Sequence, residues 1–138
     1  MTFLLDTNVL SELRKGSRAD DSVSGWFMRN RGRGLYISVM VLGELRKGVE
    51  RLRPRDADSA RALDAWIDDT RLRFDGRIIP LDEEVAEEWG RMSATDPPPI
   101  VDGLIAATAK VHGLTLVTRN VADVERTGVR CLDPFLPD

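Results

Sequence analysis

Short apolar runs alternate with amphipathic segments along this chain of 138 residues. The apolar runs are bounded by turn residues, as expected for buried strands, and lie at residues 3–5, 35–38, 78–81, 114–117 and, less clearly, 129–132. Apolar residues at helical spacing lie between them, at residues 20–29, 41–52, 60–72, 85–92 and 100–112, and a shorter helical pattern begins at Val9. Strands that alternate with helices predict an α/β/α sandwich around a central, mainly parallel sheet of about five short strands.

The composition fits one domain that spans residues 1–138, because 42% of the residues are hydrophobic. No apolar run approaches the ~20 residues of a membrane span, and no charged segment followed by an apolar one resembles a secretion signal. Cys131 is the single cysteine, which fits a reducing compartment. We therefore expect a cytoplasmic protein.

Asp6 directly follows the apolar run Phe3–Leu5. The carboxyl ends of parallel strands form the crevice where ligands bind, so an acid at this point is a candidate for chemistry. Asp is also a common helix N-cap, and Val9, Leu10 and Leu13 begin a helical pattern just beyond it. Taken alone, Asp6 fits both roles equally well.

Two further acids lie at unusual places on predicted helices. Glu44 lies to one side of the apolar stripe of its helix, beside Gly43, although pairing with Lys47 on a wet surface would also explain it. Asp102 follows three prolines, residues 97–99, and falls in the first turn of its helix. Stabilisation by the helix dipole would explain Asp102, but small residues share its side of the helix and would hold it close to the sheet.

A polar group follows the run that ends at Val117. Asn120 occupies the same kind of strand-end position as Asp6, with Thr118 before it and Asp123 after it, although Asn is also a common turn residue. Carboxylates that converge at strand ends without His or Cys neighbours suit a hard divalent cation, here Mg²⁺ or Mn²⁺. The single histidine, His112, lies at the far end of the helix from Asp102, so this inventory favours metal-assisted phosphodiester hydrolysis over a histidine base.

The net charge of −3 has the wrong sign for nucleic-acid binding through the overall field. Basic residues nevertheless cluster locally, at Arg29, Arg31 and Arg33 and again at Arg46, Lys47, Arg51, Arg53 and Arg55. Such clusters are usually solvated helix surfaces, but they can also contact phosphates.

The sequence resembles the PIN-domain family, specifically the VapC-like and FitB-like toxins of toxin–antitoxin pairs. Four segments carry the resemblance in order, namely LLDTNVLSE at residues 4–12, VLGELRKG at 41–48, DGLIAATA at 102–109 and VTRN at 117–120. Each segment alone is weak, whereas the four at compatible spacing are specific.

The resemblance implies a role for each matching residue. Asp6, Glu44 and Asp102 match the metal-binding acids, Thr118 matches a small hydroxyl residue of the site, and Asn120 stands where many members have Asp. Asp123 could replace that fourth acid, directly or through water, and a second metal ion would then be weakly held. With Asp6 as a ligand, helix capping would fall to Thr7 and Asn8. The candidates for RNA contact are Arg46, Lys47 and Arg119.

The family consists of RNA-cleaving toxins that arrest growth until an antitoxin neutralises them. The resemblance therefore implies a Mg²⁺-dependent endoribonuclease that forms a homodimer and a larger complex with a cognate antitoxin, which alone would contact DNA. Two alternatives stay open at this point. Asp6 could be the nucleophile of a haloacid-dehalogenase-like phosphatase, although Asn8 replaces its second Asp and Lys110 is distant from Asp102, or the chain could be a catalytically degenerate PIN-like binding module.

Overall fold

The computed structural model describes residues 1–137 and contains one five-stranded sheet of order β3-β2-β1-β4-β5. The strands are β1 (Thr2–Leu5), β2 (Gly34–Ser38), β3 (Ile78–Ile79), β4 (Thr115–Val117) and β5 (Cys131–Leu132), and each neighbouring pair is parallel. The predicted strand segments and the parallel sheet are confirmed, with the third and fifth strands shorter than expected.

The helices follow the predicted amphipathic segments. They are α1 (Thr7–Leu13), α2 (Asp21–Asn30), α3 (Val39–Leu52), α4 (Ala57–Arg73), α5 (Glu83–Ser93), α6 (Ile100–His112) and α7 (Val121–Val124), with 3-10 turns η1 (Gly16–Arg18) and η2 (Glu125–Thr127). Side-chain caps explain several starts: Asp20, Ser38, Asp56 and Asp82 each accept a hydrogen bond from a backbone N–H in the first turn. Helix α6 ends at Gly113, whose φ of 66° favours glycine.

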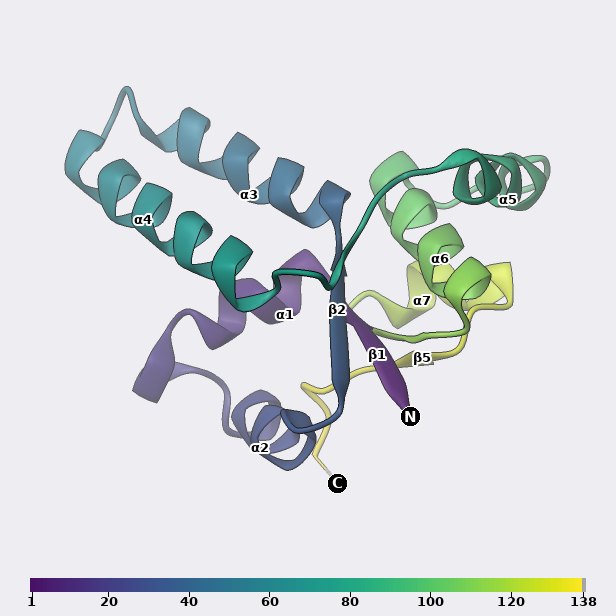
Figure 1. The fold of residues 1–138 in the computed structure, drawn as a ribbon, viewed down its shortest axis with the longest axis horizontal. Coiled ribbons are helices and arrows are strands. Elements are labelled where there is room, and N and C mark those ends of the chain that lie inside the picture. Colours follow the sequence, from purple (N-terminus) through teal and green to yellow (C-terminus); the bar gives the residue numbers. More distant parts are fainter. Residues whose placement is uncertain (138) are drawn as a thin grey trace.

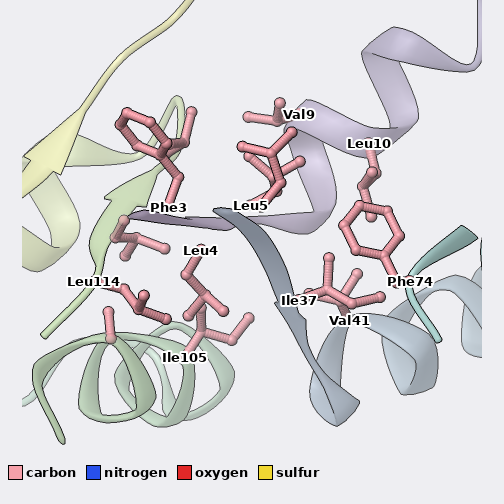
Figure 2. Close-up of a cluster of buried hydrophobic side chains, with 14 of the residues drawn as sticks. Phe3, Leu4, Leu5, Val9, Leu10, Ile37, Val41, Phe74, Ile105 and Leu114 are labelled. Atoms are coloured by element: carbon pink, nitrogen blue, oxygen red, sulfur yellow. The ribbon is translucent and has the colours of Figure 1, made fainter. Parts of the chain in front are cut away.

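Strand β1 is buried on both faces, and this requires its unbroken apolar sequence. Figure 2 shows Leu5 directed toward Val9 of α1, while Leu4 points the opposite way, toward Ile105 of α6. Phe3 makes an edge-to-face contact with Trp26 of α2, with ring centroids 5.1 Å apart. Full burial of each such side chain contributes about 1.5–3 kcal/mol, so β1 anchors the helical layers on both sides.

The helices form two arms around this core. The α3–α4 hairpin extends to one side of β2, whereas the α5–α6 pair lies to the other side, close to α7 (Figure 1). The order in which strands are added to the sheet reverses between β1 and β4. From β1 the chain continues to β2 and β3 on one side, and it then returns to add β4 and β5 on the other. Ligands bind at the carboxyl ends of the strands at such a switch point, which here lies between Asp6 and Thr118.

Among the helices within residues 1–137, none combines the length and apolar character that crossing a membrane would require.

Candidate active site

Asp6 lies at the end of β1 and is only 5% exposed. Its backbone N–H donates to Val117 O of β4 at 3.0 Å, which fixes the strand end. Its Oδ1 accepts from the Thr7 N–H at 2.8 Å, so Asp6 itself is the N-cap of α1. The expectation that Thr7 and Asn8 would take over capping is wrong, because their side chains bond across the site instead.

A hydrogen-bonded triangle holds the second oxygen of Asp6. Thr118 Oγ1 donates to Asp6 Oδ2 at 2.7 Å, and Asn8 Nδ2 lies 3.3 Å from both Asp6 Oδ2 and Thr118 Oγ1. The Asn8 Oδ1 accepts from the Arg119 backbone N–H at 3.1 Å, and Thr118 Oγ1 accepts from the Asn120 N–H at 3.0 Å. Thr118 thus joins the ends of β1 and β4 and orients the Asp6 carboxylate.

Glu44 reaches the same region from α3. Its Oε1 accepts a hydrogen bond of 2.5 Å from Thr7 Oγ1, although the two residues are 37 positions apart in the sequence. Glu44 is half-buried, and this bond between two helices stands in place of the alternative explanation, a surface pairing with Lys47. The sequence pattern did not reveal the contact between Thr7 and Glu44, since no local spacing links the two residues.

Asp102 lies in the first turn of α6 and is half-buried. Burial, and to a smaller extent the negative charges of Asp6, Glu44 and Asp123, together raise its pKa from 3.8 to about 6. Burial also raises the pKa of Asp6, against the opposing effect of its bonds from Thr118, Thr7 and Asn8. Asp6, Glu44 and Asp123 are therefore each close enough to Asp102 for their charges to act on its carboxyl group.

Asn120 directly precedes α7, and Asp123 lies within it. Asn120 is its N-cap residue but makes no side-chain capping bond, while Asp123 is exposed within the helix. The Asp123 N–H donates to Asn120 O at 3.0 Å, which closes the first turn of this short helix. Of the two, Asp123 supplies the negative charge that acts on Asp102.

The chemistry of this donor set fits a divalent cation. Within residues 1–137, the groups that shift the pKa values of Asp6 and Asp102 include no cationic side chain. Carboxylates that lack a counter-charge offer the oxygen ligands that a divalent cation prefers. In the same part of the chain, no three His, Cys, Asp or Glu side chains are already grouped tightly enough to form a ready-made metal site. Holding an ion would therefore require the carboxylates to draw closer together.

The basic candidates lie in different surroundings. Arg46 of α3 is paired with Asp64 at 2.6 Å and with Glu50 at 3.3 Å, which ties α3 to α4. Lys47 is exposed on the same helix. The Arg119 guanidinium lies 4.4 Å from the Phe135 ring centroid, and its backbone follows Thr118 directly. Of the three basic candidates, Arg119 is thus the residue whose backbone N–H bonds to Asn8 beside Asp6.

A separate groove of about 550 Å³ is lined mainly by residues of α1, α2 and α4. Leu10, Leu13, Phe27 and Trp66 are among its apolar lining residues, and none of the candidate site residues lines it. Among the described residues that line the groove, Asp69 is the single acid, so the groove has no set of carboxylates comparable to that around Asp6.

Comparison with known proteins places these features in a family. The sequence model described as the PIN domain matches residues 3–128. The VapC ribonuclease Y4jK of Sinorhizobium fredii is 30% identical over 97% of this chain and 98% of its own length. The toxin FitB of Neisseria gonorrhoeae is 33% identical over 96% of this chain and 97% of its own length.

Solved structures give the same result. A structure of FitAB bound to an IR36 DNA fragment contains a chain with a TM-score of 0.88 and 29% identity, covering 99% of this chain and 98% of that one. A DNA-bound VapBC of Salmonella typhimurium gives a TM-score of 0.79 at 26% identity, covering 97% and 98%. The similarity extends over the whole sheet and the helices that carry the candidate site.

Proposed function

The chain belongs to the PIN-domain family, and we propose that it is the toxin of a toxin–antitoxin pair, a Mg²⁺-dependent endoribonuclease whose active site is the carboxylate cluster around Asp6. The observation that carries the proposal is that acids from four separate elements meet at the switch point of the sheet, where burial first and then the charges of Asp6, Glu44 and Asp123 raise the pKa of Asp102. The similarity to a VapC ribonuclease supplies the reaction class.

In this proposal Asp6, Glu44 and Asp102 hold the ion. When bound, Mg²⁺ neutralises phosphate charge and lowers the pKa of a water molecule for attack on the phosphodiester. Thr118 and Asn8 orient Asp6 through their hydrogen bonds, and Thr7 orients Glu44. Asn120 and Asp123 border the site on the α7 side, where Asp123 offers the carboxylate that Asn120 lacks.

The contact with RNA is proposed to rest on exposed basic side chains beside the acids. Arg119 and Lys47 are the better placed, whereas Arg46 is already paired with Asp64 and its replacement would also loosen the contact between α3 and α4. Local cations of this kind offset the repulsion between an acidic site and the phosphate backbone.

The phosphatase alternative is not favoured. The side chain of Asn8 is used to orient Asp6 and Thr118, and Lys110 is bound to Glu88 at 3.0 Å and to the Thr127 carbonyl at 2.7 Å. Neither residue is thus placed to serve a phosphorylated Asp6.

For partners, we propose a homodimer that binds a cognate antitoxin, with DNA contacted through the antitoxin alone. The proposal is supported by the FitAB and VapBC complexes that this chain resembles. We expect the antitoxin to be encoded by a short reading frame next to this gene, and its co-expression to restore growth.

Induced expression in bacteria tests the function. We expect the wild type to arrest growth and fragment cellular RNA, and Asp6→Asn to do neither at equal protein level. Asp68→Asn is a matched control, because Asp68 is an exposed acid of α4 paired only with Arg71 among the described residues. Growth and RNA that are unaffected by the wild type would contradict the proposal.

A further inference from the structure

Asp102 and Asp123 are carried by different elements, and one arginine connects those elements. Arg126 lies in η2, directly after the helix that holds Asp123. Its Nε donates to Asp96 O at 3.0 Å, its Nη2 donates to Pro97 O at 3.2 Å, and its Nε also lies 3.3 Å from Asp96 Oδ2. The guanidinium therefore clamps the loop that leads into α6.

The loop that Arg126 contacts has a backbone conformation that is unfavourable on its own. Asp96 has a φ of 50°, in the left-handed region, although a residue before proline strongly prefers an extended backbone. Such a conformation persists where surrounding contacts enforce it. Arg126 supplies those contacts, since it binds both the carbonyl and the carboxylate of Asp96.

The position of this loop determines the position of Asp102, because the loop packs tightly against the first turn of α6. Pro98 is buried, and a Cβ added to Gly103 would lie 3.3 Å from the Pro98 ring and 3.3 Å from the Trp89 ring. The Gly103 N–H also donates to Pro99 O at 2.9 Å in the first turn of α6. The start of α6 is thus packed against the prolines with no spare room, so a moved loop would move Asp102.

A second tie keeps η2 against the body of α6. Lys110 Nζ donates to the Thr127 carbonyl at 2.7 Å and pairs with Glu88 of α5 at 3.0 Å. With η2 held by Lys110, Arg126 is a fixed strut between the Asp123 side and the Asp102 side of the site.

We propose that Arg126 is a positioning residue, which sets the separation of Asp102 from Asp123 by clamping Asp96 and Pro97 to η2. The inference rests on the proposed metal-dependent function. Arg126 touches neither reacting group, and it acts on the ion only through the carboxylates that it places.

Mn²⁺ binding to the purified full chain, measured by electron paramagnetic resonance, tests the proposal, because the electrostatic effect and the loss of positioning predict opposite changes in affinity. Arg126→Met removes a positive charge, which by simple electrostatics would tighten cation binding. Loss of the clamp predicts the opposite, a Kd for Mn²⁺ raised by about 10-fold, within the 10–100-fold range for residues that orient metal ligands. Arg126→Lys keeps the charge but has no planar fork to bridge two carbonyls, and should weaken binding similarly.

Arg130→Met is the matched control, because Arg130 is exposed and donates at 2.9 Å to a single carbonyl, that of Gly113 at the other end of α6. We expect its Mn²⁺ affinity to stay within twofold of the wild type. In Arg126→Met, amide hydrogen exchange at residues 100–103 should also accelerate, with little change in thermal stability, since Arg126 is 39% exposed.

The outcomes separate this inference from the proposed function. Arg126→Met and Arg126→Lys that bind Mn²⁺ as tightly as the wild type, or more tightly, would overturn the positioning role while leaving the nuclease proposal intact. A wild type that does not bind Mn²⁺ at all would overturn the metal site and the positioning role together.

Discussion

Replacing Asp102 with asparagine should stabilise the protein while removing its activity. Its carboxyl group must ionise beside Asp6, Glu44 and Asp123 in partly buried surroundings, and no cationic side chain among the described residues offsets this cost. Neutral asparagine keeps nearly the same shape without the charge. A residue held in a destabilising state by its role in function is a common source of such stability–activity trade-offs.

The magnitude follows from the pKa. A rise from 3.8 to about 6 corresponds to about 3 kcal/mol at the ~1.4 kcal/mol of each tenfold change in proton affinity. Solvent screening at this half-buried position reduces the value to roughly 1–2 kcal/mol. The helix dipole favours the negative charge by about 0.3–1 kcal/mol and is lost in the variant. A net gain of about 1 kcal/mol remains, or roughly 3–5 °C in Tm for a domain of this size.

The pH dependence identifies the cause. Because the folded-state pKa is raised, the folded wild type holds its proton more tightly than the unfolded chain does, and stability from this group is fully present below pH 3.8. That stability is lost as pH rises through about 6, so the advantage of Asp102→Asn should grow between pH 4 and 7 and then level off.

Urea denaturation in EDTA at several pH values measures this difference, with Asp68→Asn as the surface control. The wild type and Asp102→Asn should be nearly equal near pH 4 and should differ by about 1 kcal/mol at pH 7.5. An Asp102→Asn variant that is no more stable than the wild type at pH 7.5, or a difference that does not change with pH, would refute the electrostatic account of this site.

Three further predictions concern the supports of the carboxylates. Thr7→Val should reduce RNA cleavage roughly 10–100-fold in a gel assay, because Glu44 loses the bond that orients it, whereas Thr7→Ser should retain most activity; equal rates for both variants would contradict this role. Gly103→Val should lower the free energy of unfolding by about 1–3 kcal/mol, because the new side chain clashes with Trp89 and Pro98. Gly48→Ala, whose Cβ meets nothing within 4 Å, should raise the free energy of unfolding by about 0.5–1 kcal/mol. Urea denaturation that shows the same direction of change in both variants would argue against this packing. Mg²⁺ should raise the Tm of the wild type more at pH 7.5 than at pH 5, because protons compete for the carboxylates, and a Tm shift that is independent of pH would count against a carboxylate site.

The sequence predicted the architecture well because strand and helix patterns are local. The alternation of apolar runs with helical stripes located every strand. Asp6 and Asp123 were indicated by their positions after strands, and Asp102 by its position in the first turn of a helix. The helix α7 was not predicted, since its four residues are too short for a periodic pattern to develop.

The contacts that orient the acids could not be predicted in the same way. Thr118 and Asp6 are 112 positions apart, and only the parallel pairing of β1 with β4 brings them to 2.7 Å. The ion pair of Arg46 with Asp64 likewise depends on how the α3–α4 hairpin closes. Such bonds are set by tertiary geometry, so the sequence indicated the acids and, through the family resemblance, Thr118, but not that the Thr7 hydroxyl and the Asn8 amide bond to Glu44 and Asp6.

Incubation of purified protein with total RNA tests the central claim most directly. The account predicts that the wild type and Asp68→Asn cut RNA in Mg²⁺, that EDTA stops both, and that Asp6→Asn is inactive at equal concentration and with an unchanged far-UV spectrum. Cleavage that persists in EDTA, or an Asp6→Asn variant as active as the wild type, would contradict a metal-dependent nuclease centred on Asp6.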